Sequence, residues 1–185
     1  MIIASSIEKS YGPQILFEDV SFLINKGERV GLVGKNGTGK STLFKMILGQ
    51  ENHDSGTLST PKGYRIGALE QHIHFTRPTV LKECIEALPP EKQWDHYKAE
   101  IILSGLGFSE QDFQKDPTTF SGGFQVRINL CKALLADPNM LLLDEPTNYL
   151  DILSLRWLKD YLNKWPGEMM IITHDRDFMD KVTTH

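Results

Sequence analysis

Residues Gly34-Lys35-Asn36-Gly37-Thr38-Gly39-Lys40-Ser41 decide the fold of this chain. They fit the pattern G-x-x-x-x-G-K-[ST], the phosphate-binding P-loop. The apolar run at 29–33 predicts a buried strand before the loop, and the spacing of residues 42–48 predicts a helix after it. In that context backbone N–H groups converge on an anion, and the helix N-terminus adds partial positive charge. We expect Lys40 to reach the β- and γ-phosphates and the Ser41 hydroxyl to ligate Mg²⁺. An ordinary glycine-rich turn is the alternative, and the complete motif in its required context disfavours it.

Length and composition limit the remaining possibilities. The 185 residues suggest one domain, and the formal net charge of −4 gives no overall basic character to favour nucleic-acid binding. Cys84 and Cys131 lie in apolar helical patterns, so we expect buried free thiols in a reducing compartment. No signal peptide and no apolar run near 20 residues is evident, and we therefore expect a cytoplasmic protein without membrane insertion.

The chain before residue 120 divides into a β-rich and a helical part. Residues 2–24 predict antiparallel strands with a turn at 11–14, and short strands return over 57–71. Helical patterns follow at 80–88, with Thr79 as N-cap, and at 98–106, and Ser109 with Asp112 suggests a cap for a third short helix. We expect a helical subdomain over 78–119, set between core segments at 1–77 and 120–185.

A second glycine-rich turn, Ser121-Gly122-Gly123, precedes a predicted helix over 124–136. The turn is either a simple helix start or a place where free N–H groups contact a second anion.

Two buried strands, predicted at 140–143 and 169–173, end in polar residues. Asp144 and Glu145 follow the first strand, and His174 follows the second. Ligands bind at the carboxyl edge of open α/β sheets, where one carboxylate suits Mg²⁺ and the other can orient or deprotonate a water. Taken alone, these residues could equally be a solvated loop and a surface histidine, but the upstream P-loop favours the functional interpretation. Strands that alternate with helices predict an α/β fold with parallel pairing.

The order of these motifs resembles one family, the ATP-binding-cassette (ABC) ATPases, over nearly the whole chain. The resemblance begins with the aromatic Tyr11 before the first turn, the P-loop Gly34–Ser41, the glutamine Gln71 and the helical segment 78–119. It continues with the signature turn Ser121-Gly122-Gly123, the acidic pair Asp144-Glu145, the pair Leu150-Asp151 and His174. It implies a P-loop NTPase of ABC type, with a mixed central sheet, an antiparallel β subdomain and a small helical subdomain.

The subfamily that the sequence resembles is ABC-F. Glu145-Pro146-Thr147-Asn148 and the run 173–178 are similar to its pattern, whereas Tyr149 stands where its members usually have histidine, and the signature turn continues with Phe124. This resemblance implies two cassettes in one chain, no membrane domain and possible work on the ribosome. Only 50 positions separate Gln71 from Ser121, which leaves little room for the helical arm of ABC-F proteins. We expect the chain to be a fragment, the first cassette of a longer protein.

The resemblance also implies a role for each motif residue. Tyr11 would stack on adenine, and Gly34, Lys35, Asn36, Gly37, Thr38, Gly39, Lys40, Ser41 and Thr42 would hold the phosphates of ATP. Ser41 and Gln71 would ligate Mg²⁺, with Asp144 supporting the ion through water. Glu145 would act as general base and His174 would contact the γ-phosphate, while Ser121, Gly122 and Gly123 would act on ATP held by a second cassette or a second copy of the chain. The alternatives are the ATPase subunit of a membrane transporter and a non-catalytic, nucleotide-dependent clamp.

Overall fold

The computed structural model describes residues 1–69 and 73–185, so the predicted ligand Gln71 lies outside the described residues. Its strands form two sheets. The first is antiparallel and has the order β2-β1-β4, built from β1 (Ile2–Tyr11), β2 (Gln14–Ile24) and β4 (Ser55–Ser59). The second is parallel and has the order β3-β7-β6-β5, built from β3 (Arg29–Gly31), β5 (Ile66–Ala68), β6 (Met140–Asp144) and β7 (Glu168–Ile172). The first sheet is the predicted antiparallel β subdomain, whereas the central sheet, expected to be mixed, is parallel throughout its described strands.

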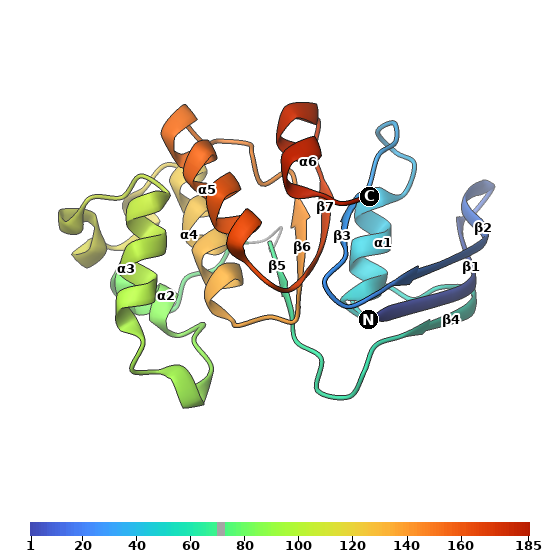
Figure 1. The fold of residues 1–185 in the computed structure, drawn as a ribbon, viewed down its shortest axis with the longest axis horizontal. Helices are drawn as coiled ribbons and strands as arrows, with labels where there is room; N and C mark the ends of the chain where they lie inside the picture. The colour runs from blue at the N-terminus through green and yellow to red at the C-terminus, as the bar shows by residue number, and fades with distance from the viewer. Residues whose placement is uncertain (70–72) are drawn as a thin grey trace.

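The helices surround the parallel sheet and extend beyond it at one end. They are α1 (Lys40–Ile47), α2 (Val80–Ile85), α3 (His96–Gly105), α4 (Gly122–Leu135), α5 (Ile152–Lys164) and α6 (Arg176–Val182), with short 3₁₀ turns η1 (Pro90–Lys92), η2 (Glu110–Gln114) and η3 (Pro117–Thr119). Figure 1 shows α2 and α3 at the end of the molecule opposite the antiparallel sheet. The predicted helices are present, except that the short third helix of the helical subdomain is the 3₁₀ turn η2. Helix α2 ends at Ile85 rather than at 88, α4 begins two residues earlier than expected, and α6 was not predicted.

Alternation along β6 and β7 divides the core into two clusters. Met140, Leu142, Met170 and Ile172 pack with α1 and the antiparallel sheet. Their neighbours Leu141, Leu143, Met169 and Ile171 point the other way and pack with α4, α5 and α6. Because both faces of the sheet are covered, its central strands are apolar throughout, and this explains why they read as continuous apolar runs.

Side-chain caps fix where several helices begin. Asp151 accepts hydrogen bonds from the N–H groups of Leu153 at 3.0 Å and Ser154 at 2.9 Å, which starts α5. Ser109 and Asp112 form the expected capping box, but the element that they start is the 3₁₀ turn η2 rather than an α-helix.

Cys84 and Cys131 are buried free thiols, as predicted, and burial raises the pKa of Cys131 well above its ordinary value. Among the described residues, no helix is long and apolar enough to cross a bilayer.

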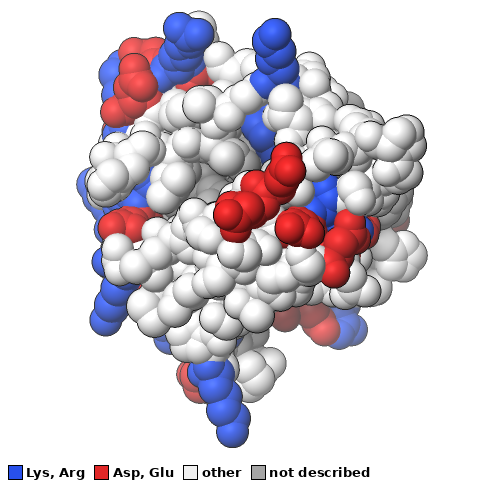
Figure 2. Space-filling model, turned by 90° about the vertical axis from the view of Figure 1, so that its right-hand side faces the viewer, with Lys and Arg blue, Asp and Glu red and all other residues white. Residues whose placement is uncertain are grey.

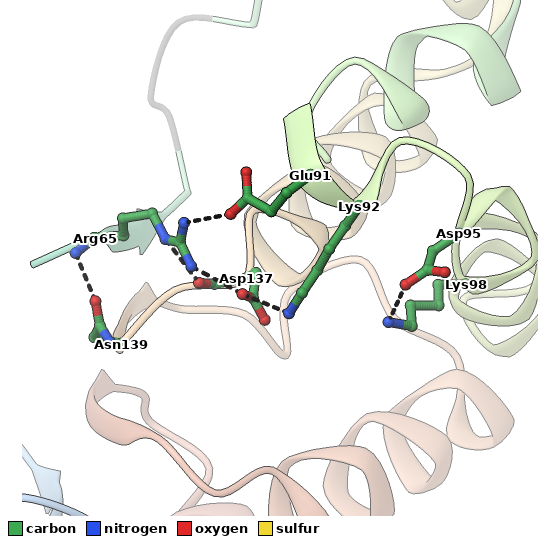
Figure 3. A network of polar contacts seen from close by, with 7 residues as sticks. All are labelled: Arg65, Glu91, Lys92, Asp95, Lys98, Asp137 and Asn139. Carbon is green, nitrogen blue, oxygen red and sulfur yellow. Dashed lines mark hydrogen bonds and ion pairs between the residues drawn. The ribbon is translucent and has the colours of Figure 1, made fainter. Parts of the chain in front are cut away.

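The amino edge of the parallel sheet carries a network of paired polar groups, shown in Figure 3. Ahead of β5 and β6, Asn139 Oδ1 accepts from the backbone N–H of Arg65 at 2.8 Å. The Arg65 guanidinium lies 2.9 Å from Asp137, and the Lys92 ammonium lies 2.7 Å from the same carboxylate oxygen. Strand starts that are far apart in sequence are thereby joined on this edge.

Candidate functional site

The P-loop folds into a tight turn between β3 and α1. Gly37 and Gly39 have positive φ values of 82° and 95°, a conformation that side chains with a Cβ rarely adopt. A Cβ on Gly39 would also lie 2.8 Å from Cζ of Phe17, so β2 closes over the loop there. Lys40 Nζ donates to the carbonyl oxygens of Gly34 at 2.8 Å and Lys35 at 2.9 Å, which places its charge across the mouth of the turn.

Ser41 and Asp144 meet at the carboxyl edge of the parallel sheet. The Ser41 hydroxyl, on the first turn of α1, donates to Oδ2 of Asp144 at 2.7 Å. One hydroxyl and one carboxylate oxygen at this spacing fit Mg²⁺, which takes oxygen ligands and relies on few protein groups besides waters and phosphates. These two predicted ligands can therefore hold the ion, whereas Gln71 lies outside the described residues.

Glu145 carries two unusual features beside this pair. Its backbone has φ +49°, which is uncommon for a residue with a side chain, and its N–H bonds the carbonyl of Ile172 at 2.8 Å. Its buried Oε1 has no hydrogen-bond partner, and Nε2 of His174 lies 3.4 Å from it. A buried carboxylate oxygen left without a donor is rare and points to a functional acceptor.

A cavity of about 630 Å³ joins these groups. Its lining includes most of the predicted P-loop residues, the acidic pair and His174, together with Tyr11, which is 48% exposed. Prediction from sequence did not single out Gln14, Leu16 and Asn148, which also line the cavity. Gln14 pairs with Tyr11 across the β1–β2 turn, so the predicted hairpin was the available signal for it.

The signature turn lies apart from this cavity. Ser121 is the N-cap residue of α4, and the Gly123 backbone lies against Tyr149, since a Cβ on Gly123 would be 3.1 Å from that of Tyr149. Ser121, Gly122 and Gly123 are absent from the cavity lining in the described part of the chain. They are therefore placed to contact something other than the contents of their own P-loop.

Prediction from sequence missed Arg127, a buried cation on α4. Its guanidinium donates to the carbonyl of Tyr149 at 2.6 and 3.0 Å and to that of Leu106 at 2.8 Å. It also lies 3.0 Å from Asp151, whose pKa falls to about 2 because the N–H of Ser154 and then Arg127 stabilise the carboxylate. Helix α4, which begins at the signature turn, is thus joined to the end of α3 and the start of α5 by one side chain. An arginine between apolar Val126 and Ile128 was the only signal in the sequence.

Glu83 forms a second buried link to α4. Its carboxylate accepts from Lys132 Nζ at 2.5 Å and from the backbone N–H groups of Thr76 and Arg77 at 2.9 Å. Burial by itself would raise the pKa of Glu83, but these donors outweigh it and hold the pKa below its ordinary value. The carboxylate therefore stays charged and ties residues 76–77 and α2 to the signature helix.

Comparisons with known proteins agree with this geometry. The family described as ABC transporter matches residues 17–148. The chain is 41% identical to the energy-dependent translational throttle protein EttA of Escherichia coli (strain K12) over 184 residues, which are 98% of this chain and 33% of that protein. The chain thus spans about a third of the length of this relative.

Solved structures share the fold at low sequence identity. The ATP-binding subunit of an ABC transporter superposes with a TM-score of 0.80 at 23% identity, over 99% of this chain and 83% of that one. A dimeric bacterial ABC transporter cassette gives 0.77 at 23% identity, over 98% and 91%. With the family match over residues 17–148, the P-loop against its acidic strand tip identifies this chain as a member of the ATP-binding-cassette family.

Proposed function

We propose that this chain is one cassette of an ABC-F ATPase, which binds MgATP and hydrolyses it together with a second cassette. The observation that supports this best is the meeting of Ser41, Asp144, Glu145 and His174 around the P-loop in one cavity. If the glycine-rich turn and His174 had no common role, we would not expect them to line one cavity with Asp144 and Glu145.

Each residue has a role that its position supports. The P-loop amides and Lys40 hold the triphosphate, and Tyr11 stacks on the adenine at the opposite wall. Ser41 and Asp144 would hold Mg²⁺, which would supply positive charge beside the phosphates. Oε1 of Glu145 accepts a hydrogen bond from the attacking water and is kept in place by His174. It takes the water's proton as the water oxygen bonds to the γ-phosphorus and the bond from that phosphorus to the β–γ bridging oxygen breaks, which leaves ADP and phosphate. His174 is 70% exposed at its side chain and can reach the γ-phosphate.

Hydrolysis needs a second cassette, because Ser121, Gly122 and Gly123 do not line the cavity at their own P-loop in the described part of the chain. Tyr149, Ile152 and Leu153 are exposed large hydrophobic residues around the start of α5, and Tyr149 lies against Gly123 of the signature turn. They would be buried in such a pair. Phosphoryl transfer depends on charge stabilisation, so a cassette without those donors should be slow. The chain is then one of two cassettes in a longer protein, with residues 78–119 as its helical subdomain.

Two measurements test the ATPase proposal. Titration calorimetry should detect MgATP binding by the 185-residue chain, and Ser41→Ala should lose the dependence of binding on Mg²⁺. Turnover per molecule should rise with protein concentration, as expected for paired cassettes. Full turnover that is independent of concentration, or no heat with folded protein, would refute the proposal.

The finer role follows from the relative EttA, whose name describes a translational throttle. We propose that the longer protein couples ATP to conformational work on the ribosome in the cytoplasm. The second candidate is the ATPase subunit of a transporter, favoured by the fold shared with the ATP-binding subunit of an ABC transporter. Co-sedimentation of the Glu145→Gln protein with ribosomes in MgATP supports the first role, and recovery with membranes supports the second.

A further inference from the structure

Lys9 is a buried cation next to the proposed adenine site. It lies on β1 two residues before Tyr11, at a point where the pairing of β1 with β2 is irregular between Lys9 and Ser10. Only 7% of Lys9 is exposed, although lysine is rarely buried unless it is paired. Its burial therefore calls for partners, and these come from a distant part of the chain.

The partners belong to the segment that follows the P-loop helix. Lys9 Nζ donates to Oε1 of Glu51 at 2.7 Å and to the carbonyl of Asn52 at 2.8 Å, and it lies 3.5 Å from Oδ1 of Asp54. The hydrogen bond to Glu51 is the main reason that the pKa of Lys9 is raised, so its charge persists. Figure 2 shows the end of the molecule at the antiparallel sheet, where acidic side chains gather near the middle of the face.

The same segment is fixed to α1. The N–H groups of Gln50 and Glu51 both bond the carbonyl of Lys45, at 2.8 and 3.3 Å. Asp54 Oδ2 in turn accepts from the N–H of Ser10 at 2.7 Å, beside Tyr11 in the chain. A continuous path of hydrogen bonds thus runs from the end of the P-loop helix through Lys9 to the strand that carries the aromatic ring.

The ammonium of Lys9 also contacts the ring itself, since Nζ lies 4.8 Å from the centroid of Tyr11. Tyr11 lines the phosphate cavity, whereas Lys9 is absent from its lining in the described part of the chain. The ring therefore has a cation on its protein side and leaves other surface open to the cavity. A cation over an aromatic ring is attractive and restrains the ring's orientation.

We propose that Lys9 is a positioning residue for base recognition, which holds the Tyr11 ring at a fixed place relative to the P-loop. The inference rests on the proposed ATP site and adds to it a residue that does not touch nucleotide. A ring that is already held in place loses less freedom when a base stacks on it. Lys9 then affects the affinity for the base and leaves the affinity for the phosphates unchanged.

Calorimetric titrations with two probes, MgATP and magnesium tripolyphosphate, test this role. Lys9→Met keeps the aliphatic stem and removes the charge, and we expect it to weaken MgATP about three- to fivefold. Tyr11→Ala should weaken MgATP about tenfold, since a stacked base is lost. Tripolyphosphate, which has no base, should bind both variants as it binds the parent. Lys62→Met, at an exposed turn lysine, is the matched control and should change neither probe.

A double variant separates positioning from a merely structural role. With Tyr11→Ala present, Lys9→Met should cause no further loss of MgATP affinity, and Lys9→Arg in the parent should stay within about twofold. Equal losses for both probes, or additive losses in the double variant, would overturn the role of Lys9 while leaving Tyr11 as the base contact. If Tyr11→Ala had no effect on MgATP, the adenine assignment of the proposed function would fail first, and the role of Lys9 with it.

Discussion

The two edges of the parallel sheet use the same kinds of residue in opposite ways. At the amino edge, Arg65, Lys92 and Asp137 satisfy one another's charges, and Asn139 satisfies a backbone N–H (Figure 3). At the carboxyl edge, Oε1 of Glu145 is buried without a hydrogen bond. A left-handed backbone does not distinguish the edges, because φ is +48° at Asp137 and +49° at Glu145. One edge completes its interactions within the chain, and the other keeps an acceptor available.

This difference indicates that polar groups at the amino edge stabilise the fold, whereas those at the carboxyl edge remain available for binding or catalysis. Strain and unsatisfied polar groups persist only where the surrounding structure supports them, and they gather at functional sites. Substitutions at the carboxyl edge should therefore change turnover or nucleotide affinity and leave folding nearly unchanged. Substitutions at the amino edge should do the reverse.

The largest effect is expected at Glu145. Glu145→Gln removes the proton acceptor, and we expect turnover in the paired protein to fall by about 100-fold or more. The free energy of unfolding should stay within about 0.5 kcal/mol, because Oε1 has no hydrogen bond to lose. Phosphate release under saturating MgATP and chemical denaturation measure the two quantities. Turnover at the parent rate would show that another group accepts the proton.

The second largest effect is expected at Lys40. Lys40→Met removes a charge-assisted contact to the phosphates, so MgATP affinity should fall roughly 10- to 100-fold. Calorimetry measures the loss, with Lys62→Met as the control for removal of an exposed lysine charge. Affinity within twofold of the parent would place the triphosphate elsewhere.

Asn139 tests the amino edge. Asn139→Ala removes the acceptor for the N–H of Arg65, and we expect the free energy of unfolding to fall by about 1 kcal/mol. Asn139→Asp keeps an acceptor oxygen and should lose less. MgATP affinity should remain unchanged in both variants, and a tenfold loss would show that the two edges are coupled.

The smallest effect is expected at Asp137, whose partners Arg65 and Lys92 are largely exposed. Asp137→Asn should cost about 0.5 kcal/mol or less and should cost nothing measurable in 1 M salt. The hydrogen bond from Lys92 lowers the pKa of Asp137, so its contribution is present above the ordinary value of 3.8 and is lost as pH falls through the lowered pKa. Denaturation curves between pH 6 and pH 2 should show the parent and the variant converging in acid.

Periodicity and motif order were sufficient to predict most of the fold. The apolar runs at β6 and β7 are buried on both faces, so their composition alone indicates central strands. Helix α6 was not predicted because seven residues give little periodicity, although Asp175 accepts from the N–H of Phe178 at 2.9 Å as an N-cap. The order of the strands in the parallel sheet, β3-β7-β6-β5, depends on contacts between distant segments and was not predicted.

The site was predicted where topology brings strand ends together, and missed where burial decides a residue's role. Ser41, Asp144 and His174 follow from the rule that ligands bind at the carboxyl edge. Lys9 and Arg127 carry charges that normally lie in water, so a sequence gives no reason to place them inside. The left-handed backbone of Glu145 is equally hidden, because residues with a Cβ seldom take it.

Arg127 has a consequence for how a pair of cassettes would open. Its guanidinium, on α4, donates to the carbonyls of Leu106 and Tyr149 and pairs with Asp151. Glu83 joins α4 to residues 76–77 by accepting from Lys132 and from the N–H groups of these two residues. Because α4 is bonded to the end of α3, the start of α5 and residues 76–77, we expect these segments to move together as one rigid unit. In a pair of cassettes, we therefore expect any displacement of α4 to carry the end of α3 and the start of α5 with it.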